Sequence, residues 1–350
     1  MEFLKVTARN LDHFLSSDLY VNSDFLIIPE IRARSMAKNP AMLPEDPLFI
    51  ISHDQNKITG FIGFFPDKLQ DGTQIFWNSG WWVSEGQGFQ TSLQLFKMFV
   101  EACRHQIMIT DTTLHTTQLM RAMPGFSAHT GRKAYRIFLQ APSAMKSVNV
   151  LKRKLIAGIG GMYSFILKTV IYKRSKKNAT VRFEQTSPGN LNLDVLDACN
   201  KESAIHLSRE KLQWIHENPW VTEDSVTDKR RYSFTYGVDD FWSEMIEIKS
   251  DSQVIGWCYI TVVNGMLKVP YSYFQKEYAE DVANGILNQA LAKKCHSIYL
   301  MNPFLVDAIS RLLPFFSMKR KYEVPLFVSD NLSITKPILL QDGDGDAVFT

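Results

Sequence analysis

The sequence predicts an α+β fold (α/β-like) of two related domains, each a mostly antiparallel mixed sheet flanked by helices. Three observations support this prediction. The phrase RAMPGFS at Arg121–Ser127 returns as RLLPFFS at Arg311–Ser317, with Arg, Pro, Phe and Ser at the same offsets. The same order of elements, paired strands, helix, strand, helix and strand, surrounds both phrases. The chain of 350 residues is also longer than most single hydrophobic cores.

The elements of the first copy follow from its apolar spacing. Runs rich in β-branched and aromatic residues predict strands at Lys57–Phe65 and Ile75–Val83. Apolar residues at helical spacing predict a helix over Ser92–Gln106. The short run Ile107–Thr113 predicts a strand leading into a second helix, and Ala134–Gln140 predicts the closing strand.

The second copy repeats this order. Strands are predicted at Ser252–Val263 and Met266–Phe274, followed by a helix over Glu277–Cys295. A short strand at Ser297–Asn302 leads into the helix that carries the second phrase, and Glu323–Ser329 predicts the closing strand. Two α+β units in one chain are therefore expected.

With its elements in this order, the sequence resembles the GNAT superfamily of acyl-CoA-dependent acyltransferases, in a tandem arrangement like that of FemAB-type and myristoyltransferase-like proteins. KITGFIGFF, WWVSEGQGFQTSLQLF, IMITDTT and LMRAMPGFS carry the resemblance across Lys57–Ser127, and Gln253–Ser317 repeats their order. The resemblance implies a first GNAT-like domain at 1–145, a basic apolar linker helix at 146–182 and a second GNAT-like domain at 183–350.

The resemblance also implies acyl-CoA, as acetyl-CoA or a longer thioester, and a turn that holds its pyrophosphate. Backbone N–H groups at a helix start carry the positive end of the helix dipole and bind phosphate. The turn SEGQGFQTS supplies the candidate residues, which are Val83, Gly86, Gln87, Gly88, Phe89, Gln90, Thr91 and Ser92. The alternative is a tight turn whose glycines only relieve strain. The second half has no glycine there and brings Glu277, Glu280 and Asp281 to the helix start, so the first half is expected to bind acyl-CoA.

Candidate catalytic residues come from a comparison with the family's tyrosine acid, which stands four residues before the glycine of its G-F phrase. That position is Arg121 here, and Arg311 in the second copy. An arginine does not act as an acid near neutral pH, but it stabilises a developing anion or holds a phosphate. An amine acceptor needs a base, because its ammonium form is not a nucleophile. Glu85 and Asp111 are the candidate bases, with a capping or surface role as the alternative.

Tryptophans supply candidate substrate contacts. LQWIHENPW resembles a W-x-x-x-x-P phrase of tandem acyltransferases in surface-polysaccharide pathways. Trp214 and Trp220 are therefore expected to line a sugar or acyl pocket, and Trp82 is expected beside the cofactor turn. The alternative for each tryptophan is a place in the hydrophobic core.

The C-terminal QDGDGDAVFT is expected to be a flexible acidic tail. It resembles a calcium loop only superficially, because the distal bidentate Glu is absent, so no metal is expected. The alternative comes from tandem acyltransferases whose chain end folds back to the active site. In that case Asp342, Asp344 or Asp346 meets the acceptor amine.

An asymmetry of charge predicts an anionic partner. Between Thr112 and Phe183 there is no Asp or Glu, while Lys and Arg supply 14 positive charges, although the whole chain has a net charge of only +3. Val150–Lys177 combines an apolar stripe with basic ends, which predicts a helix lying on an anionic membrane surface. A linker helix packed between the domains is the alternative. A nucleic acid partner (tRNA) is less favoured, because the interleaved apolar residues are mostly aliphatic.

The expected location is cytoplasmic, with peripheral attachment to the inner face of the membrane. The four cysteines are far apart and form no CxxC pair, and the N-terminus has no uninterrupted apolar core of a signal peptide. The expected function is transfer of an acyl group from acyl-CoA to an amine or hydroxyl of a sugar or lipid-linked sugar. The alternatives are a FemAB-like aminoacyltransferase using aminoacyl-tRNA, and a non-catalytic GNAT-fold scaffold for a membrane or protein.

Overall fold

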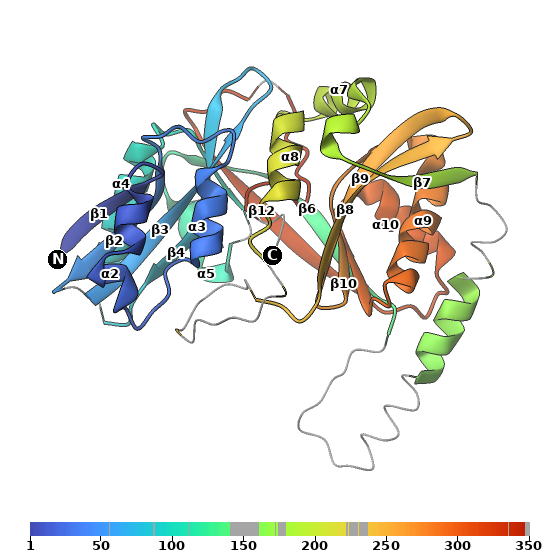
Figure 1. Ribbon diagram of the computed structural model, residues 1–350, viewed down its shortest axis with the longest axis horizontal. Helices are drawn as coiled ribbons and strands as arrows, with labels where there is room; N and C mark the ends of the chain where they lie inside the picture. The colour runs from blue at the N-terminus through green and yellow to red at the C-terminus, as the bar shows by residue number, and fades with distance from the viewer. Residues whose placement is uncertain are drawn as a thin grey trace, which may run out of the picture. The chain divides into compact units, whose positions relative to one another are not determined.

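The computed structural model of the chain forms two compact units (Figure 1). It describes residues 1–55, 57–86, 88–110, 112–140, 161–171, 173, 180–221, 223, 230, 237–334 and 336–346. Unit 1 comprises Met1–Gly131, Ala198–Val238 and Val324–Thr350. Unit 2 comprises Arg132–Asp197 and Asp239–Glu323. Each unit therefore contains segments from both halves of the sequence, which differs from the contiguous ranges expected above.

The sheet of unit 1 has the strand order β1-β2-β3-β4-β5-β12. Its first three pairs are antiparallel, β4 and β5 are parallel, and β5 and β12 are antiparallel. The strands are β1 (Glu2–Thr7), β2 (Pro47–Asp54), β3 (Lys57–Lys68), β4 (Gln74–Val83), β5 (Ile107–Thr110) and the end of β12 (Lys319–Ser329). The helices are α1 (Leu11–Leu15), α2 (Asp18–Val21), α3 (Glu30–Ala37), α4 (Gly88–Ala102), α5 (Leu114–Ala122) and α8 (Arg209–Glu217).

Helices cover both faces of this sheet, so its central strands are apolar almost throughout. The ten consecutive residues from Ile58 to Asp67 in β3 are buried. On one face, Phe96 and Phe99 of α4 pack in a core with alternate residues of β2, β3 and β4. On the other face, α3 lies against these strands (Figure 1). The alternation of side chains along each strand supplies both cores.

The strands of unit 2 repeat this order, as β6-β11-β10-β9-β8-β7. Read from β7, the first three pairs are again antiparallel, β10 and β11 are parallel, and β11 and β6 are antiparallel. The strands are the end of β6 (Phe126–Phe138), β7 (Val181–Thr186), β8 (Phe241–Ser250), β9 (Gln253–Val263), β10 (Met266–Phe274) and β11 (Ser297–Leu300). The helical elements are η1 (Pro188–Asn190), α7 (Leu193–Glu202, which continues into unit 1), η2 (Lys276–Tyr278), α9 (Ala279–Ala292) and α10 (Pro303–Leu312).

The closing strands are exchanged between the two halves of the chain. β12 follows α10 of the second half, yet its end pairs with β5, with Phe327 opposite Ile109. β6 follows α5 of the first half, yet its end pairs with β11, with Ile137 opposite Ile298. The fold class is confirmed: two α+β units, each a mostly antiparallel mixed sheet flanked by helices. The exchange explains why the compact units do not coincide with contiguous halves.

The described part of the predicted linker packs on unit 2. Residues 161–171 are helical, and Leu167 and Ile171 are buried in the unit 2 core with residues of α9 and α10. Residues 146–160, 172 and 174–179 of the expected linker lie outside the described residues. No helix in the described ranges is long and apolar enough to cross a lipid bilayer.

Candidate acyl-transfer site in unit 1

Strands β4 and β5 part within unit 1. The two strands pair in parallel at Phe76 with Ile107 and at Trp77 with Met108. β4 then continues to Val83, and no further β4–β5 pair occurs among the described residues. Backbone N–H and C=O groups of a strand edge need partners, because leaving them unpaired costs free energy. The edge of β4 beyond Trp77 is therefore suited to an extended ligand that carries amides.

A β-bulge interrupts β4 at the point where the strands part. Ile62 lies opposite Trp81, but Phe64 lies opposite Asn78, so Ser79 and Gly80 together face Gly63. Gly80 has φ +92°. A Cβ on Gly63 would lie 2.1 Å from the carbonyl oxygen of Ser79, so only glycine fits there. The bulge fixes the direction of the Ser79 side chain.

The predicted glycine turn lies at the start of α4. Ser84 N–H donates to the Thr59 carbonyl at 2.8 Å, and the chain turns through Gly86 (φ +92°) to Gly88 (φ +74°), the first residue of α4. A Cβ on either glycine would meet no atom within 4 Å. The two glycines therefore serve the backbone conformation and leave the space beside the turn open.

The N-terminus of α4 has the properties of an anion site. α4 spans 15 residues and has no acidic residue in its first turn. Phe89 and Gln90 are exposed, Thr91 is buried with its hydroxyl on Met1 Sδ at 3.4 Å, and Val83 and Ser92 are half-buried. Gln87 lies outside the described residues. The helix begins at Gly88 rather than at Ser92. The residues Gly88–Thr91, which were expected in the loop before the helix, therefore form the first turn of α4.

Two of the three candidate catalytic residues, Glu85 and Arg121, lie in the described part of the chain and are not in contact. Glu85 is exposed in the turn, and Arg121 is exposed in the last turn of α5. No hydrogen bond or ion pair joins these two side chains in the described part of the chain. Asp111 lies outside the described residues. Their catalytic roles stay predictions.

A buried cluster that the sequence analysis did not identify lies at the bulge. Arg32 of α3 is only 2% exposed, and its guanidinium donates to Ser79 Oγ at 2.9 Å and to Asp346 Oδ2 at 2.5 Å. Ser79 Oγ donates to the same carboxylate oxygen at 2.7 Å. The Arg32 guanidinium also lies over the Trp220 ring, 5.3 Å from its centroid. The acidic tail was the one signal of this cluster in the sequence, and no pattern indicated that Arg32 is buried.

The C-terminal tail folds back onto unit 1, which corrects the expectation of a flexible tail for residues up to 346. Asp342 and Asp344 are buried, and Gln341 N–H donates to Asp344 Oδ2 at 2.7 Å. Gly345, at φ +71°, lies against the Trp77 ring. Asp346 retains an exposure of 27%. The tail brings the Asp346 carboxylate to the buried Arg32 guanidinium, and this pairing of opposite charges favours the docked position of the tail.

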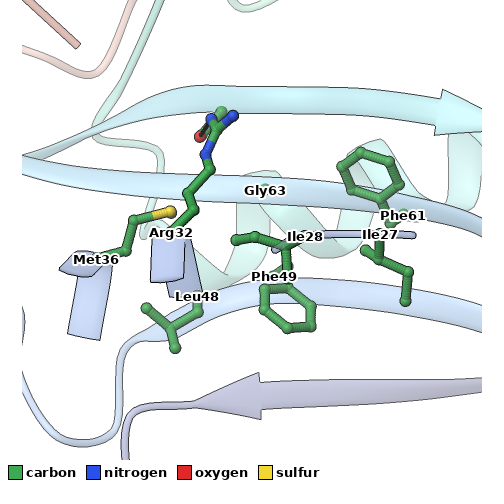
Figure 2. Close-up of a pocket in the computed structure, with 9 residues that line it drawn as sticks. Ile27, Ile28, Arg32, Met36, Leu48, Phe49, Phe61 and Gly63 are labelled. Carbon is green, nitrogen blue, oxygen red and sulfur yellow. Dashed lines mark hydrogen bonds between the residues drawn. The ribbon is translucent and has the colours of Figure 1, made fainter. Parts of the chain in front are cut away.

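An apolar pocket adjoins this cluster. Figure 2 shows the Arg32 side chain crossing the strands, with Met36 beside it. Leu48 and Phe49 lie below in this view, and Ile28, Ile27 and Phe61 lie toward the right. The cavity has a volume of about 10 Å³, and Ser79 completes its lining. A cavity of this volume holds about one water molecule, so it is much smaller than a small-molecule site.

The predicted substrate tryptophans differ in their surroundings. Trp82 is half-buried on β4, next to the turn, and stacks on Phe25 with ring centroids 4.1 Å apart. Trp214 and Trp220 are buried and pack on Phe65, which is the core position given as their alternative. The Trp220 ring contacts Arg32, which lines the pocket. A substrate-binding role for the three tryptophans stays a prediction.

The corresponding place in unit 2 is closed to phosphate. β10 pairs with β11 over three residues and then parts from it, as in unit 1. However, the turn into α9 contains no glycine, and Glu280 and Asp281 occupy the first turn of the helix. Asn302 donates from Nδ2 to Ser272 Oγ of β10 at 3.1 Å. Within the described residues, no group of His, Cys, Asp or Glu gathers as a metal site requires.

The arrangement of strands in both units is the fold of the GNAT-superfamily acyltransferases, and this confirms the predicted fold. Two solved structures with a TM-score of 0.50 are GCN5-related N-acetyltransferases. The one from Kribbella flavida is 11% identical, over 93% of this chain and 71% of that one. The one from Anabaena variabilis is 10% identical, over 93% of this chain and 72% of that one.

A third structure with the same TM-score of 0.50 is a GCN5-related glucosamine N-acetyltransferase region of a fungal multi-domain GH3 β-N-acetylglucosaminidase. It is 12% identical, over 93% of this chain and 38% of that one. No family model matches the chain, and no curated protein matches it in sequence. Identities this low establish the fold alone, and the FemAB-type likeness is not confirmed.

Proposed function

We propose that the protein is an acyltransferase that moves an acyl group from acyl-CoA to an amine or hydroxyl of a sugar or lipid-linked sugar. One observation carries the proposal. In unit 1, β4 leaves β5 at a bulge and ends in a turn with two positive-φ glycines, at the start of a long helix without acidic residues in its first turn. The unit 2 counterpart lacks the glycines and has carboxylates at that helix start.

The proposed donor site follows the edge of β4 toward α4. Backbone N–H groups at Gly88, Phe89 and Gln90 begin a helix and face outward at the positive end of its dipole, so they suit the pyrophosphate. The edge of β4 from Asn78 to Val83 offers backbone groups to an extended arm with amides. When bound, the thioester supplies the activated acyl group. The chain's own groups bind it, orient its carbonyl and stabilise the oxyanion through backbone N–H groups.

The Arg32, Ser79 and Asp346 cluster is placed for acceptor chemistry. An amine must lose a proton before it attacks a thioester. Asp346 is held at the bulge by Ser79 and Arg32 and is partly exposed, so its carboxylate is a candidate base in addition to Glu85 and Asp111. The glucosamine N-acetyltransferase region with this fold makes amino sugars the first acceptors to screen.

One observation favours a second candidate, a non-catalytic protein that keeps the fold. The position of the family's tyrosine acid holds Arg121, whose side chain is exposed on α5. A non-catalytic scaffold requires no proton donor there. The aminoacyl-tRNA alternative depends mainly on the basic stretch between Thr112 and Phe183, of which residues 141–160, 172 and 174–179 lie outside the described residues.

The first test is the thermal stability of the protein with CoA, acetyl-CoA and longer acyl-CoAs. A ligand at 100 times its Kd stabilises the folded state by roughly 2.7 kcal/mol, which raises Tm by several degrees. We expect such a rise for the wild type and its loss in Gly88→Trp. Gly72→Trp is the matched control, because Gly72 also has positive φ (+85°) and open space around it but lies at the opposite end of β4.

The outcomes separate the alternatives. A shift that survives in Gly72→Trp and is lost in Gly88→Trp places the donor at the α4 turn. A shift that both variants keep would place the donor elsewhere. If no thioester raises Tm, the acyl-CoA proposal fails, and binding of tRNA with its steep salt dependence becomes the next measurement.

A further inference from the structure

Unit 2 exposes a group of large apolar side chains far in sequence from the acyl-transfer site. Phe315, in the turn between α10 and β12, is fully exposed, and its neighbour Phe316 is also exposed. The helix at 161–171 exposes three more apolar residues. The whole group, termed the apolar patch, comprises Met162, Phe165, Ile166, Phe315 and Phe316.

Tyr163 joins the two parts of the apolar patch. Its ring meets the Phe316 ring edge to face, with centroids 6.1 Å apart. Its hydroxyl donates to the Phe138 carbonyl at 2.9 Å and accepts from Met318 N–H at 3.1 Å. Because Leu167 and Ile171 anchor the opposite face of the helix in the unit 2 core, the patch is one surface on a fixed base.

The surroundings of the apolar patch are positively charged. The helix 161–171 has no acidic residue, and the segment 313–323 has one, Glu323, whose carboxylate pairs with Lys321 at 3.5 Å. Five exposed cations accompany the patch, on the helix, just after it and at the start of β12. They are Lys168, Lys173, Lys319, Arg320 and Lys321.

Lipid matches this combination better than a second copy of the chain. A two-fold interface through the patch would bring two sets of like charges together. An anionic bilayer instead takes apolar side chains into the boundary between headgroups and acyl chains and places cations against its headgroups. A pair of exposed phenylalanines followed by Lys-Arg-Lys suits both requirements.

We propose that unit 2 docks on an anionic lipid bilayer through the apolar patch, with Phe315 and Phe316 entering the interface and the five cations contacting headgroups. This inference does not depend on the acyl-transfer proposal. It names a surface on the described residues, and it adds a loop beyond the basic stretch in which the sequence alone predicted membrane contact. If both proposals hold, the enzyme works beside lipid-linked acceptors.

The test is co-sedimentation of the full chain with vesicles of phosphatidylcholine, alone or with 30% phosphatidylglycerol added. We expect binding to the anionic vesicles, weakened by salt. Phe315→Ser with Phe316→Ser should weaken it at least about tenfold. Lys319→Glu, Arg320→Glu and Lys321→Glu together should weaken it roughly 100-fold, at about fivefold or more for each cation. Leu114→Ser, which removes an exposed apolar side chain from unit 1, should bind as the wild type does.

The phenylalanine variant should unfold within a few degrees of the wild-type Tm, because Phe315 is fully exposed and Phe316 is partly exposed, with a ring contact to Tyr163. The proposal is overturned if the wild type does not bind anionic vesicles, if it binds neutral vesicles equally well, or if the phenylalanine variant binds as well as wild type. Light scattering gives a further check. A dimer in the wild type that the phenylalanine variant loses would assign the patch to contact between copies of this chain instead.

Discussion

At the scale of single residues, burial determines which charged side chains contribute most to the stability of unit 1. Asp67 and Lys211 form an ion pair at 2.7 Å with both side chains buried, and Trp77 Nε1 donates to the same Asp67 carboxylate at 3.2 Å. His206 lies nearby, half-buried, with Nδ1 3.3 Å from Gln70 Oε1. Breaking a buried pair by removing one partner costs about 3–5 kcal/mol, because the other charge remains buried. These groups therefore hold α8 against β3 rather than act on substrate.

His206 makes the stability of the fold depend on pH. Burial lowers its pKa below the ordinary 6.5, and the charge of Lys211 adds to this effect. Between the folded and unfolded pKa values the unfolded chain binds more protons, so the free energy of unfolding rises with pH in that window. His206→Gln should therefore flatten the fall in Tm as the pH drops below about 6.5. The measurement is Tm against pH, with exposed His115→Gln as the control, and equal slopes in wild type and His206→Gln would contradict it.

Asp346 provides the residue-scale prediction for activity. If its carboxylate accepts the proton of the acceptor amine, Asp346→Asn should lower kcat by about 10²- to 10⁴-fold, the usual contribution of a general base. The shift in Tm that acyl-CoA is proposed to produce should remain, because the proposed donor site is the α4 turn. Asp330→Asn, which removes an exposed carboxylate bonded to Ser127, is the control. A variant with wild-type kcat would remove Asp346 from the mechanism.

At the scale of elements, the ends of α4 and the C-terminal tail differ most from expectation. α4 ends at Ala102, because Arg104 and His105 adopt positive φ (52° and 59°) and end the helical backbone. The tail lies against unit 1 instead of in solvent. Its docking depends on contacts with residues far away in the sequence. Removal of the tail should therefore expose the surface of unit 1 that the tail covers.

Cys199 reports on tail docking. Its thiol is buried, and burial, followed by the charge of Asp344, raises its pKa to about 12, while a hydrogen bond from Gln341 opposes the shift. Removal of residues 341–350 should expose the thiol and lower its pKa. Labelling by iodoacetamide at pH 8, followed by mass spectrometry, should become at least about tenfold faster. Cys258, buried in unit 2, should stay unreactive in both proteins. Unchanged labelling of Cys199 would show that the tail does not cover it.

At the scale of the whole molecule, two sheets share one strand order, but only one has the features of a donor site. In each unit one strand pairs in parallel with the next strand of the chain and then separates from it. These pairs are β4 with β5 in unit 1 and β10 with β11 in unit 2. A glycine turn follows β4, whereas Asn302 bonds to β10 and two carboxylates begin α9. The two units therefore differ at the positions proposed to hold phosphate, while the apolar patch and its cations lie on unit 2.

Much of the fold and part of the site were predictable from local pattern. The predicted strands at Lys57–Phe65 and Ile75–Val83 match β3 and β4, and Gly86 and Gly88 both adopt the positive φ of a turn. The cluster at the bulge was not predictable, because Arg32 and Asp346 stand 314 residues apart. Arginine is usually exposed, so its sequence context gave no sign of burial.

The sequence by itself determined the order of the elements, their repetition and the position of the glycine turn. These features are encoded within short windows, through apolar periodicity and through residues that tolerate positive φ. Only the tertiary structure decided that β6 pairs with β11 and β12 with β5, and that the acidic tail docks at Ser79. Both outcomes depend on pairing between segments far apart in the chain, and the free energy of such pairing depends on both partners, which no local pattern contains.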